Sequence, residues 1–263
     1  MKTLEECVVA TMDGTNTAIF QHLPYILQDI WEFGSNPDTM IKIIKRRFAQ
    51  YDNLKILDLG CGKGAVSVKL SKALACKCHG VDAIPGFISF AQQKAREFGV
   101  SHLCSFEVGD IRELANRFAD FDVVILGSIG PVFGDFYSTL TILSKCVANN
   151  GIFIIDEGFI EDESNFNHPR VFKKSQVLHQ IEMADMELSE MIFANADEVK
   201  SVDDLIFTRL KKRCYELIEK YPEKENLFLD YIKNQEFENE YLENKITGVT
   251  MVIRPKTNPS IQS

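Results

Sequence analysis

The sequence predicts an α/β fold in which a mostly parallel sheet is covered by helices on both faces. Short apolar runs alternate with amphipathic segments between about residues 54 and 156. This β-α-β-α order is typical of parallel sheets, because each crossover connection places a helix against one face of the sheet. The chain has 263 residues, of which 45% are hydrophobic and 25% charged, as expected for one large globular domain with additions.

Hydrophobic patterning sets out the elements of this core in order. The first strand is expected at residues 56–59, where an apolar run ends in glycines. Pro85 opens the helix after the second strand and Gly99 ends it, because proline fits the first helical turn and glycine the position after the last. The expected strands are 56–59, 77–82, 103–108, 121–126 and 152–155, with a turn at 149–151, and the expected helices are 65–74, 85–98, 111–118 and 133–147.

Beyond residue 156 the regular alternation gives way to longer helical segments. A helix at 172–183, a strand at 186–193, two helices within 197–244 that part near Tyr221 and Pro222, and a strand at 246–253 are expected. The first fifty residues also look helical, with Pro24 and Pro37 as breakers. The predicted organisation is an N-terminal helical segment (1–50), a core (51–196), a helical insertion that serves as a lid or a dimer contact (197–245), the last strand (246–254) and a polar tail (255–263).

Composition narrows the classes of partner. A formal net charge of −9 disfavours nucleic acid, because the phosphate backbone would be repelled. The cysteine count is odd, at seven, and most lie in apolar runs, which indicates free thiols in a reducing compartment. No stretch approaches the roughly 20 apolar residues of a membrane span, and residues 1–10 contain no apolar signal core. We therefore expect a cytoplasmic protein that binds neither nucleic acid nor membrane.

The sharpest local feature is the segment Asp58-Leu59-Gly60-Cys61-Gly62-Lys63-Gly64, which follows a strand and precedes a helix. Its glycines allow a tight turn and a close approach of ligand to backbone. With Ala65 and with Asp82 at the end of the next strand, the glycines also satisfy a loose dinucleotide fingerprint. Asp58 favours a different ligand, because a carboxylate there would oppose a pyrophosphate but suit the ammonium and sulfonium of S-adenosylmethionine.

Five ordered segments resemble class I S-adenosylmethionine-dependent methyltransferases. These are the glycine segment at 56–64, Gly80-Val81-Asp82-Ala83, Val108-Gly109-Asp110-Ile111, Phe121-Asp122-Val123-Val124 with Gly127-Ser128, and Asn150-Gly151-Ile152. The resemblance covers about residues 54–156. It implies a three-layer α/β/α fold whose mostly parallel seven-stranded sheet has an antiparallel last strand, here with N-terminal helices and a helical insertion.

The resemblance also implies which residues hold the cofactor S-adenosylmethionine. Asp82 would bind both ribose hydroxyls, Ala83 would pack on adenine, and Asp110 would meet the adenine amino group. The implied cofactor-binding set is Asp58, Gly60, Cys61, Gly62, Gly64, Asp82, Ala83, Asp110, Ile111, Gly127 and Ser128. Taken alone, Asp110 is equally explained as the N-cap of a helix, and Cys61 as a small filler.

Departures from the family pattern bear on the acceptor. The loop Gly127-Ser128-Ile129-Gly130-Pro131 differs from the Asn/Asp-Pro-Pro-aromatic motif of exocyclic amino methyltransferases, which disfavours that chemistry. Gly127 also replaces the first carboxylate of a catechol-type magnesium site, so we expect no metal and activity that survives chelation. No catalytic residue is evident; the candidates are Glu157 at the end of a strand, His168 shortly after it, and Tyr25 in the N-terminal segment.

These observations favour a metal-independent methyltransferase that acts on an O, N or C nucleophile of a small molecule. If the helical insertion serves as a dimer contact, the protein would form a homodimer. Two alternatives stay open at this point. One is an NAD-dependent oxidoreductase, which Asp58 and Asp110 disfavour. The other is a catalytically inactive methyltransferase-like binding subunit, which the intact glycine loop and Asp82 disfavour.

Overall fold

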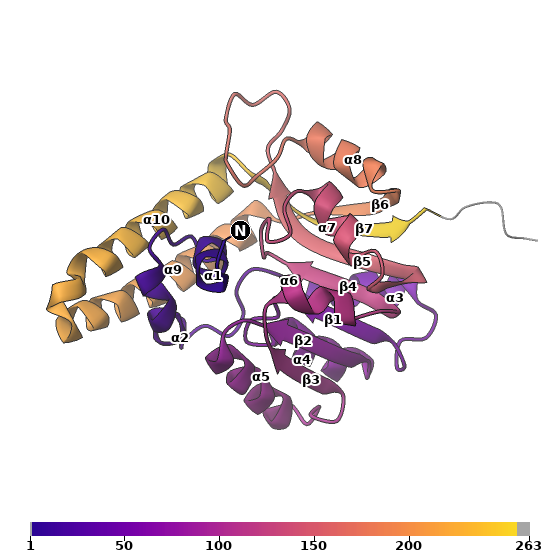
Figure 1. Ribbon diagram of the computed structural model, residues 1–263, viewed down its shortest axis with the longest axis horizontal. Helices are drawn as coiled ribbons and strands as arrows, with labels where there is room; N and C mark the ends of the chain where they lie inside the picture. The colour runs from indigo at the N-terminus through magenta and orange to yellow at the C-terminus, as the bar shows by residue number, and fades with distance from the viewer. Residues whose placement is uncertain (1, 257–263) are drawn as a thin grey trace, which may run out of the picture.

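The computed structural model describes residues 2–256 and is built on one seven-stranded sheet of order β3-β2-β1-β4-β5-β7-β6 (Figure 1). Strands β1 to β5 run parallel, and β7 is antiparallel to both β5 and β6. The strands are β1 (Lys55–Leu59), β2 (Lys77–Asp82), β3 (Cys104–Val108), β4 (Phe121–Gly127), β5 (Val147–Phe159), β6 (Met186–Phe193) and β7 (Thr247–Pro255). The predicted methyltransferase-like fold, including the antiparallel last strand, is confirmed.

Ten α-helices accompany the sheet in the described residues 2–256. They are α1 (Leu4–Thr11), α2 (Leu23–Ile26), α3 (Pro37–Arg47), α4 (Ala65–Leu74), α5 (Pro85–Glu97), α6 (Ile111–Leu114), α7 (Phe136–Leu143), α8 (Lys174–Met183), α9 (Ala196–Lys220) and α10 (Glu225–Asn244). Short 3₁₀ segments lie at Thr17–His22, Ala115–Arg117 and Pro222–Lys224.

Alternation along the parallel strands divides the core into two layers. Leu57 and Leu59 of β1 face the layer that contains α6, α7 and α8, whereas Ile56 faces the layer that contains α3 and α4. Successive side chains of a strand point to opposite faces, so a strand buried on both sides reads as one continuous apolar run. This is why the central strands could be located from the sequence.

A further apolar core lies beyond the carboxyl ends of the strands. It joins the N-terminal helices to the α9–α10 hairpin, and it reaches the sheet through Ile84 and Phe87, which follow β2. Figure 1 shows the hairpin projecting from the sheet on the same side as α1 and α2. We call residues 2–36 together with α9 and α10 the cap. Helix α3 is not part of it, because Met40, Ile43 and Ile44 pack in the sheet core.

Several expected boundaries differ from the structure. Pro24 and Pro37 do not simply break helices; each stands in the first turn of one, α2 and α3 respectively, where a missing N–H costs nothing. Strand β5 begins at Val147 rather than 152, through the expected turn, because Val147 pairs with Phe121 across an irregularity in the ladder. Most of the predicted polar tail, 257–263, lies outside the described residues.

Candidate functional site

The glycine loop forms the turn between β1 and α4. Gly60, Gly62 and Gly64 all adopt positive φ, at 75°, 53° and 72°. At Gly64 a side chain would also meet Ala91, since an added Cβ would lie 2.7 Å from the Ala91 Cβ. Both the conformation and the packing therefore require glycine here. The loop is anchored from beneath by the Val81 carbonyl, which accepts from the backbone N–H groups of Gly60 at 2.8 Å and Cys61 at 3.0 Å.

Two buried carboxylates flank this loop. Asp58 accepts a hydrogen bond from the Ser67 hydroxyl at 2.6 Å, and Asp82 accepts from the backbone N–H groups of Gly62 and Ile84, both at 2.9 Å. Burial raises the pKa of each carboxyl to about 6, and for Asp58 the neighbouring Asp82 charge adds to the effect. Each oxygen retains a lone pair that a ligand hydroxyl or cation could use.

Asp110 lies at the carboxyl end of β3 and is the N-cap of α6, where its side chain accepts from the backbone N–H of Arg112 at 2.9 Å. The Arg112 guanidinium then folds back onto the same carboxylate, with an Nη2–Oδ2 distance of 2.6 Å, and holds the pKa of Asp110 below its usual range. Arg112 also donates to the Cys7 thiol at 2.9 Å. The N-cap interpretation is therefore correct, and contact with adenine stays a prediction for both Asp110 and the buried Ile111 beside it.

The remaining cofactor candidates lie on the same edge of the sheet. Ala83 follows β2. The buried Cys61 fills space against Gly80 of that strand, because a Cβ added to Gly80 would lie 2.8 Å from the Cys61 sulfur. Gly127 ends β4, and Ser128, at a positive φ of 54°, donates its backbone N–H to the Asp156 carbonyl at 2.8 Å. The predicted set thus converges on the carboxyl ends of β1, β2, β3 and β4, where ligands bind in open α/β sheets.

A small cavity of about 30 Å³ lies next to this edge, between the 129–134 loop, the end of β5 and the 170–172 segment. Glu157 and Arg170 are the charged residues that line it; the other walls are mainly apolar and include Ile129, Phe136 and Phe172. Glu157 accepts from the backbone N–H of its neighbour Gly158 at 3.3 Å, and no side chain of the described chain donates to it. Burial raises the pKa of Glu157 to about 7, which is the range of a useful proton acceptor.

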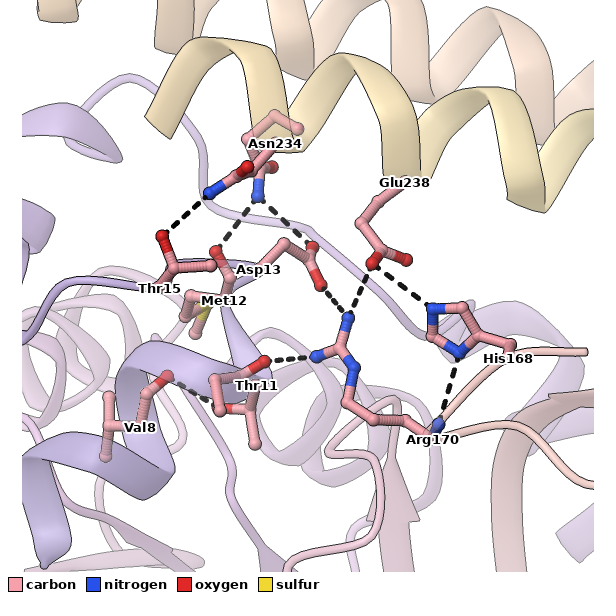
Figure 2. Close-up of polar contacts among 11 residues, drawn as sticks. Val8, Thr11, Met12, Asp13, Thr15, His168, Arg170, Asn234 and Glu238 are labelled. Atoms are coloured by element: carbon pink, nitrogen blue, oxygen red, sulfur yellow. Dashed lines mark hydrogen bonds and ion pairs between the residues drawn. The ribbon is translucent and has the colours of Figure 1, made fainter. Parts of the chain in front are cut away.

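Arg170 joins three separate parts of the chain beside this cavity (Figure 2). Its Nη2 lies 2.7 Å from Asp13 Oδ1 of the N-terminal segment and 2.9 Å from Glu238 Oε1 of α10, and its Nη1 donates to the Ala10 carbonyl. His168 lies on the same carboxylate, with Nε2 3.4 Å from Glu238 Oε1. We call these four side chains, Asp13, His168, Arg170 and Glu238, the Arg170 junction.

The structure separates the three catalytic candidates. Glu157 faces the cavity, whereas His168 belongs to the Arg170 junction, stacked on Phe166 and close to Tyr241. Tyr25 lies on the surface of the cap, 40% exposed, where its hydroxyl donates to Glu216 at 2.7 Å. The structure does not bring Tyr25 to the cavity, and a catalytic role for it stays a prediction.

Three basic residues near the site were not predicted from the sequence. Arg112 carries a local signal, because it stands two positions after Asp110. Arg170 carries none, because its partners are more than 60 residues away along the chain. Lys63 was passed over between two glycines, although its side chain is buried.

As to metal, no group of three or more His, Cys, Asp or Glu side chains that could hold an ion is found in residues 2–256. Asp156 of β5 accepts a hydrogen bond from the Thr250 hydroxyl at 3.2 Å. In the same stretch of chain no helix is both long and apolar enough to cross a bilayer.

Comparisons with known proteins identify the family. The family model described as "Methyltransferase domain" matches residues 50–244. Malonyl-[acyl-carrier protein] O-methyltransferase of Bacillus cereus is 28% identical over 185 residues, which cover 62% of this chain and just under two thirds of that protein, 66%.

Two solved structures show how widely the fold is shared. A methyltransferase of Geobacter sulfurreducens, solved with S-adenosyl-L-homocysteine, superposes with a TM-score of 0.72 at 16% identity and covers 89% of this chain and 98% of its own. The [4+2]-cyclase SpnF superposes at 0.69 with 14% identity over 97% of both chains, so the fold alone does not decide the reaction. The family match over residues 50–244 does more than the fold: the chain belongs to the methyltransferase-domain family, and its resemblance to class I S-adenosylmethionine-dependent methyltransferases is confirmed.

Proposed function

We propose that the chain binds S-adenosylmethionine at the glycine loop and methylates a small-molecule nucleophile. The observation that carries this proposal is the pair of buried carboxylates, Asp58 and Asp82, on either side of the glycine loop. Asp82 would accept from the ribose hydroxyls, and Asp58 would face the positively charged methionine end. When bound, the cofactor supplies a methyl group on a sulfonium, which is reactive without a metal.

Asp58 argues against a dinucleotide, whereas Asp82 could hold ribose hydroxyls of either ligand. The negative charge of Asp58 would lie beside the pyrophosphate of NAD, whereas Rossmann sites for dinucleotides leave the phosphates to backbone N–H groups. A thermal-shift comparison tests the choice directly. S-adenosylmethionine and S-adenosylhomocysteine should raise the melting temperature and NAD should not; stabilisation by NAD alone would refute the proposal.

Glu157 supports an acceptor that carries an O–H or N–H group. An acceptor whose nucleophilic group reaches the neighbouring cavity would have its proton within reach of a carboxylate that is free of side-chain partners in the described chain. Glu157 would take that proton as the nucleophile bonds to the methyl carbon. The carbon–sulfur bond would break at the same time, and its electron pair would stay on sulfur. The apolar walls also exclude water from the transfer.

The acceptor can be sought by measuring S-adenosylhomocysteine release over a panel of small phenols, amines and carboxylic acids, with and without EDTA. Turnover that EDTA abolishes and magnesium restores would overturn metal independence. With an acceptor in hand, Glu157→Gln should lower kcat by about 10²-fold or more at neutral pH, as expected for loss of a general base. Release without any decrease in the Gln variant would remove Glu157 from catalysis.

The rival function is a binding or non-transferring role on the same fold, which the cyclase named above makes concrete. Cofactor binding without turnover on any acceptor would favour that rival. Cytoplasmic location and the absence of nucleic-acid binding stay predictions from composition, and a homodimer stays a prediction from the helical insertion.

A further inference from the structure

Lys63 lies inside the glycine loop, yet its side chain forms its hydrogen bonds with the cap. The residue is only 3% exposed, and its ammonium donates to the carbonyls of Leu27 and Ile30, the latter at 2.7 Å. These two carbonyls follow helix α2, where the chain turns toward the sheet. The side chain therefore joins the loop after β1 to a segment more than 30 residues earlier in the chain.

The environment of this ammonium is unusual for a lysine. Within residues 2–256 Lys63 forms no ion pair; the rings of Phe87 and Phe90 lie 5.6 and 4.8 Å from Nζ instead. Burial lowers the pKa of Lys63 to about 8. Burying a charge without a counter-ion is costly, and an apolar side chain could fill the space without that cost. What the lysine adds is its hydrogen bonds to the cap.

The cap also contacts and covers the loops that would bind S-adenosylmethionine, the methyl donor. Trp31 donates its indole N–H to the Lys63 carbonyl at 3.1 Å. The ring of Phe33 lies over Gly62, 3.0 Å from where a Cβ would stand, and the Ser35 hydroxyl lies 2.4 Å from the corresponding position of Gly127. Residues 30–36 thus run across both the glycine loop and the loop after β4.

We propose that Lys63 is a positioning residue that fastens residues 30–36 over the donor, so that donor binding and closure of this segment form one coupled equilibrium. The proposal rests on the proposed function, because it takes the glycine loop as the donor site. A donor that enters beneath the segment must displace it, and the segment must then close again. Coupling of this kind is reciprocal, so a change that favours the open segment weakens the binding of the methyl donor by the same factor by which the bound donor favours closure.

The chain provides its own probe, because Trp31 is its single tryptophan and lies in the segment itself. Acrylamide quenching of Trp31 fluorescence, with and without S-adenosylhomocysteine, reports how open the segment is. The test variant is Lys63→Met, which keeps the length of the side chain and removes the N–H groups that donate hydrogen bonds to the cap. The matched control is Lys72→Met, because Lys72 is exposed and lies in the last turn of α4, the helix that follows the glycine loop.

In the wild type and in Lys72→Met, S-adenosylhomocysteine should reduce quenching. Lys63→Met should show a quenching constant about twofold higher without ligand, as expected for local opening. It should also bind S-adenosylhomocysteine about tenfold more weakly by calorimetry, equivalent to about 1.4 kcal/mol. Quenching and affinity that both match the control would overturn the proposal.

Hydrogen exchange on the wild type keeps the proposal testable if Lys63→Met does not fold. S-adenosylhomocysteine should slow amide exchange in residues 30–36, and binding without that protection would also overturn it. The failure of the proposed function looks different. In that case the wild type binds no S-adenosylhomocysteine, while the quenching of Lys63→Met without ligand still decides whether Lys63 fastens the segment.

Discussion

At the scale of single residues, Asp82 has two tasks, since it shapes the glycine loop through Gly62 and is the proposed ribose acceptor. Asp82→Ala should weaken S-adenosylhomocysteine binding by about 1.5–3 kcal/mol, the range for hydrogen bonds to a charged group. Calorimetry measures this, with Asp52→Ala, an exposed acid before β1, as the control. An affinity equal to that of the control would exclude Asp82 from the donor site.

The same carboxylate predicts how donor affinity depends on pH. The pKa of Asp82 is raised from 3.8 to about 6, so the group is charged at pH 7.5 and mostly neutral at pH 5.0. A neutral carboxyl is the weaker acceptor, and if the charged form is required the affinity should fall roughly tenfold between these pH values. Calorimetry at both values tests this, provided that circular dichroism shows a folded protein at pH 5.0. A flat profile would mean that the charge of Asp82 does not contribute.

At the scale of elements, the Arg170 junction holds the N-terminal segment, the loop after β5 and helix α10 together. Arg170→Ala would leave Asp13 and Glu238 near each other without the cation, so we expect a loss of about 2 kcal/mol in the free energy of unfolding. Arg254→Ala is the matched control, because the Arg254–Glu187 pair is more exposed and should contribute less than about 1 kcal/mol. Urea denaturation compares the two variants.

Hydrogen exchange distinguishes a local from a global effect of Arg170→Ala. Amides of residues 2–16 and 225–244 should exchange faster, while those of β1 and β4 should not. Equal acceleration throughout the chain would indicate that the junction stabilises the whole fold rather than the contact between these elements.

At the scale of the whole molecule, the sequence was sufficient for what depends on local pattern. Strands β1 and β4 are mainly apolar runs, and the donor candidates lie at the ends of β1 to β4 in recognisable order, so the site edge could be located without coordinates. Even α9 and α10 were anticipated, because each carries an apolar stripe. The antiparallel place of β7 came from resemblance to a family rather than from the residues.

What could not be predicted depends on contacts between distant parts of the chain. Tyr25 looked like a catalytic candidate because nothing local shows that it pairs with Glu216. The partners of Arg170 lie 157 and 68 residues away from it, and no spacing rule connects them. Nothing in the sequence around Lys63 indicates that its ammonium reaches carbonyls more than 30 residues earlier in the chain.

The core of the cap has a consequence for the order in which the molecule assembles. Its N-terminal members end at Ile30 and its hairpin members begin at Leu210, 180 residues later in the chain. During synthesis, strands β1 to β5 have left the ribosome before the α9 and α10 residues that share this core with Leu23 and Ile26 exist. Contacts this distant are closed late, because the loop entropy must be overcome first. In refolding followed by pulsed hydrogen exchange, the amides of α9 and α10 should therefore become protected after those of β1 and β4. Until then the apolar faces of the N-terminal helices are exposed, and this interval is when a newly made chain is most prone to aggregate.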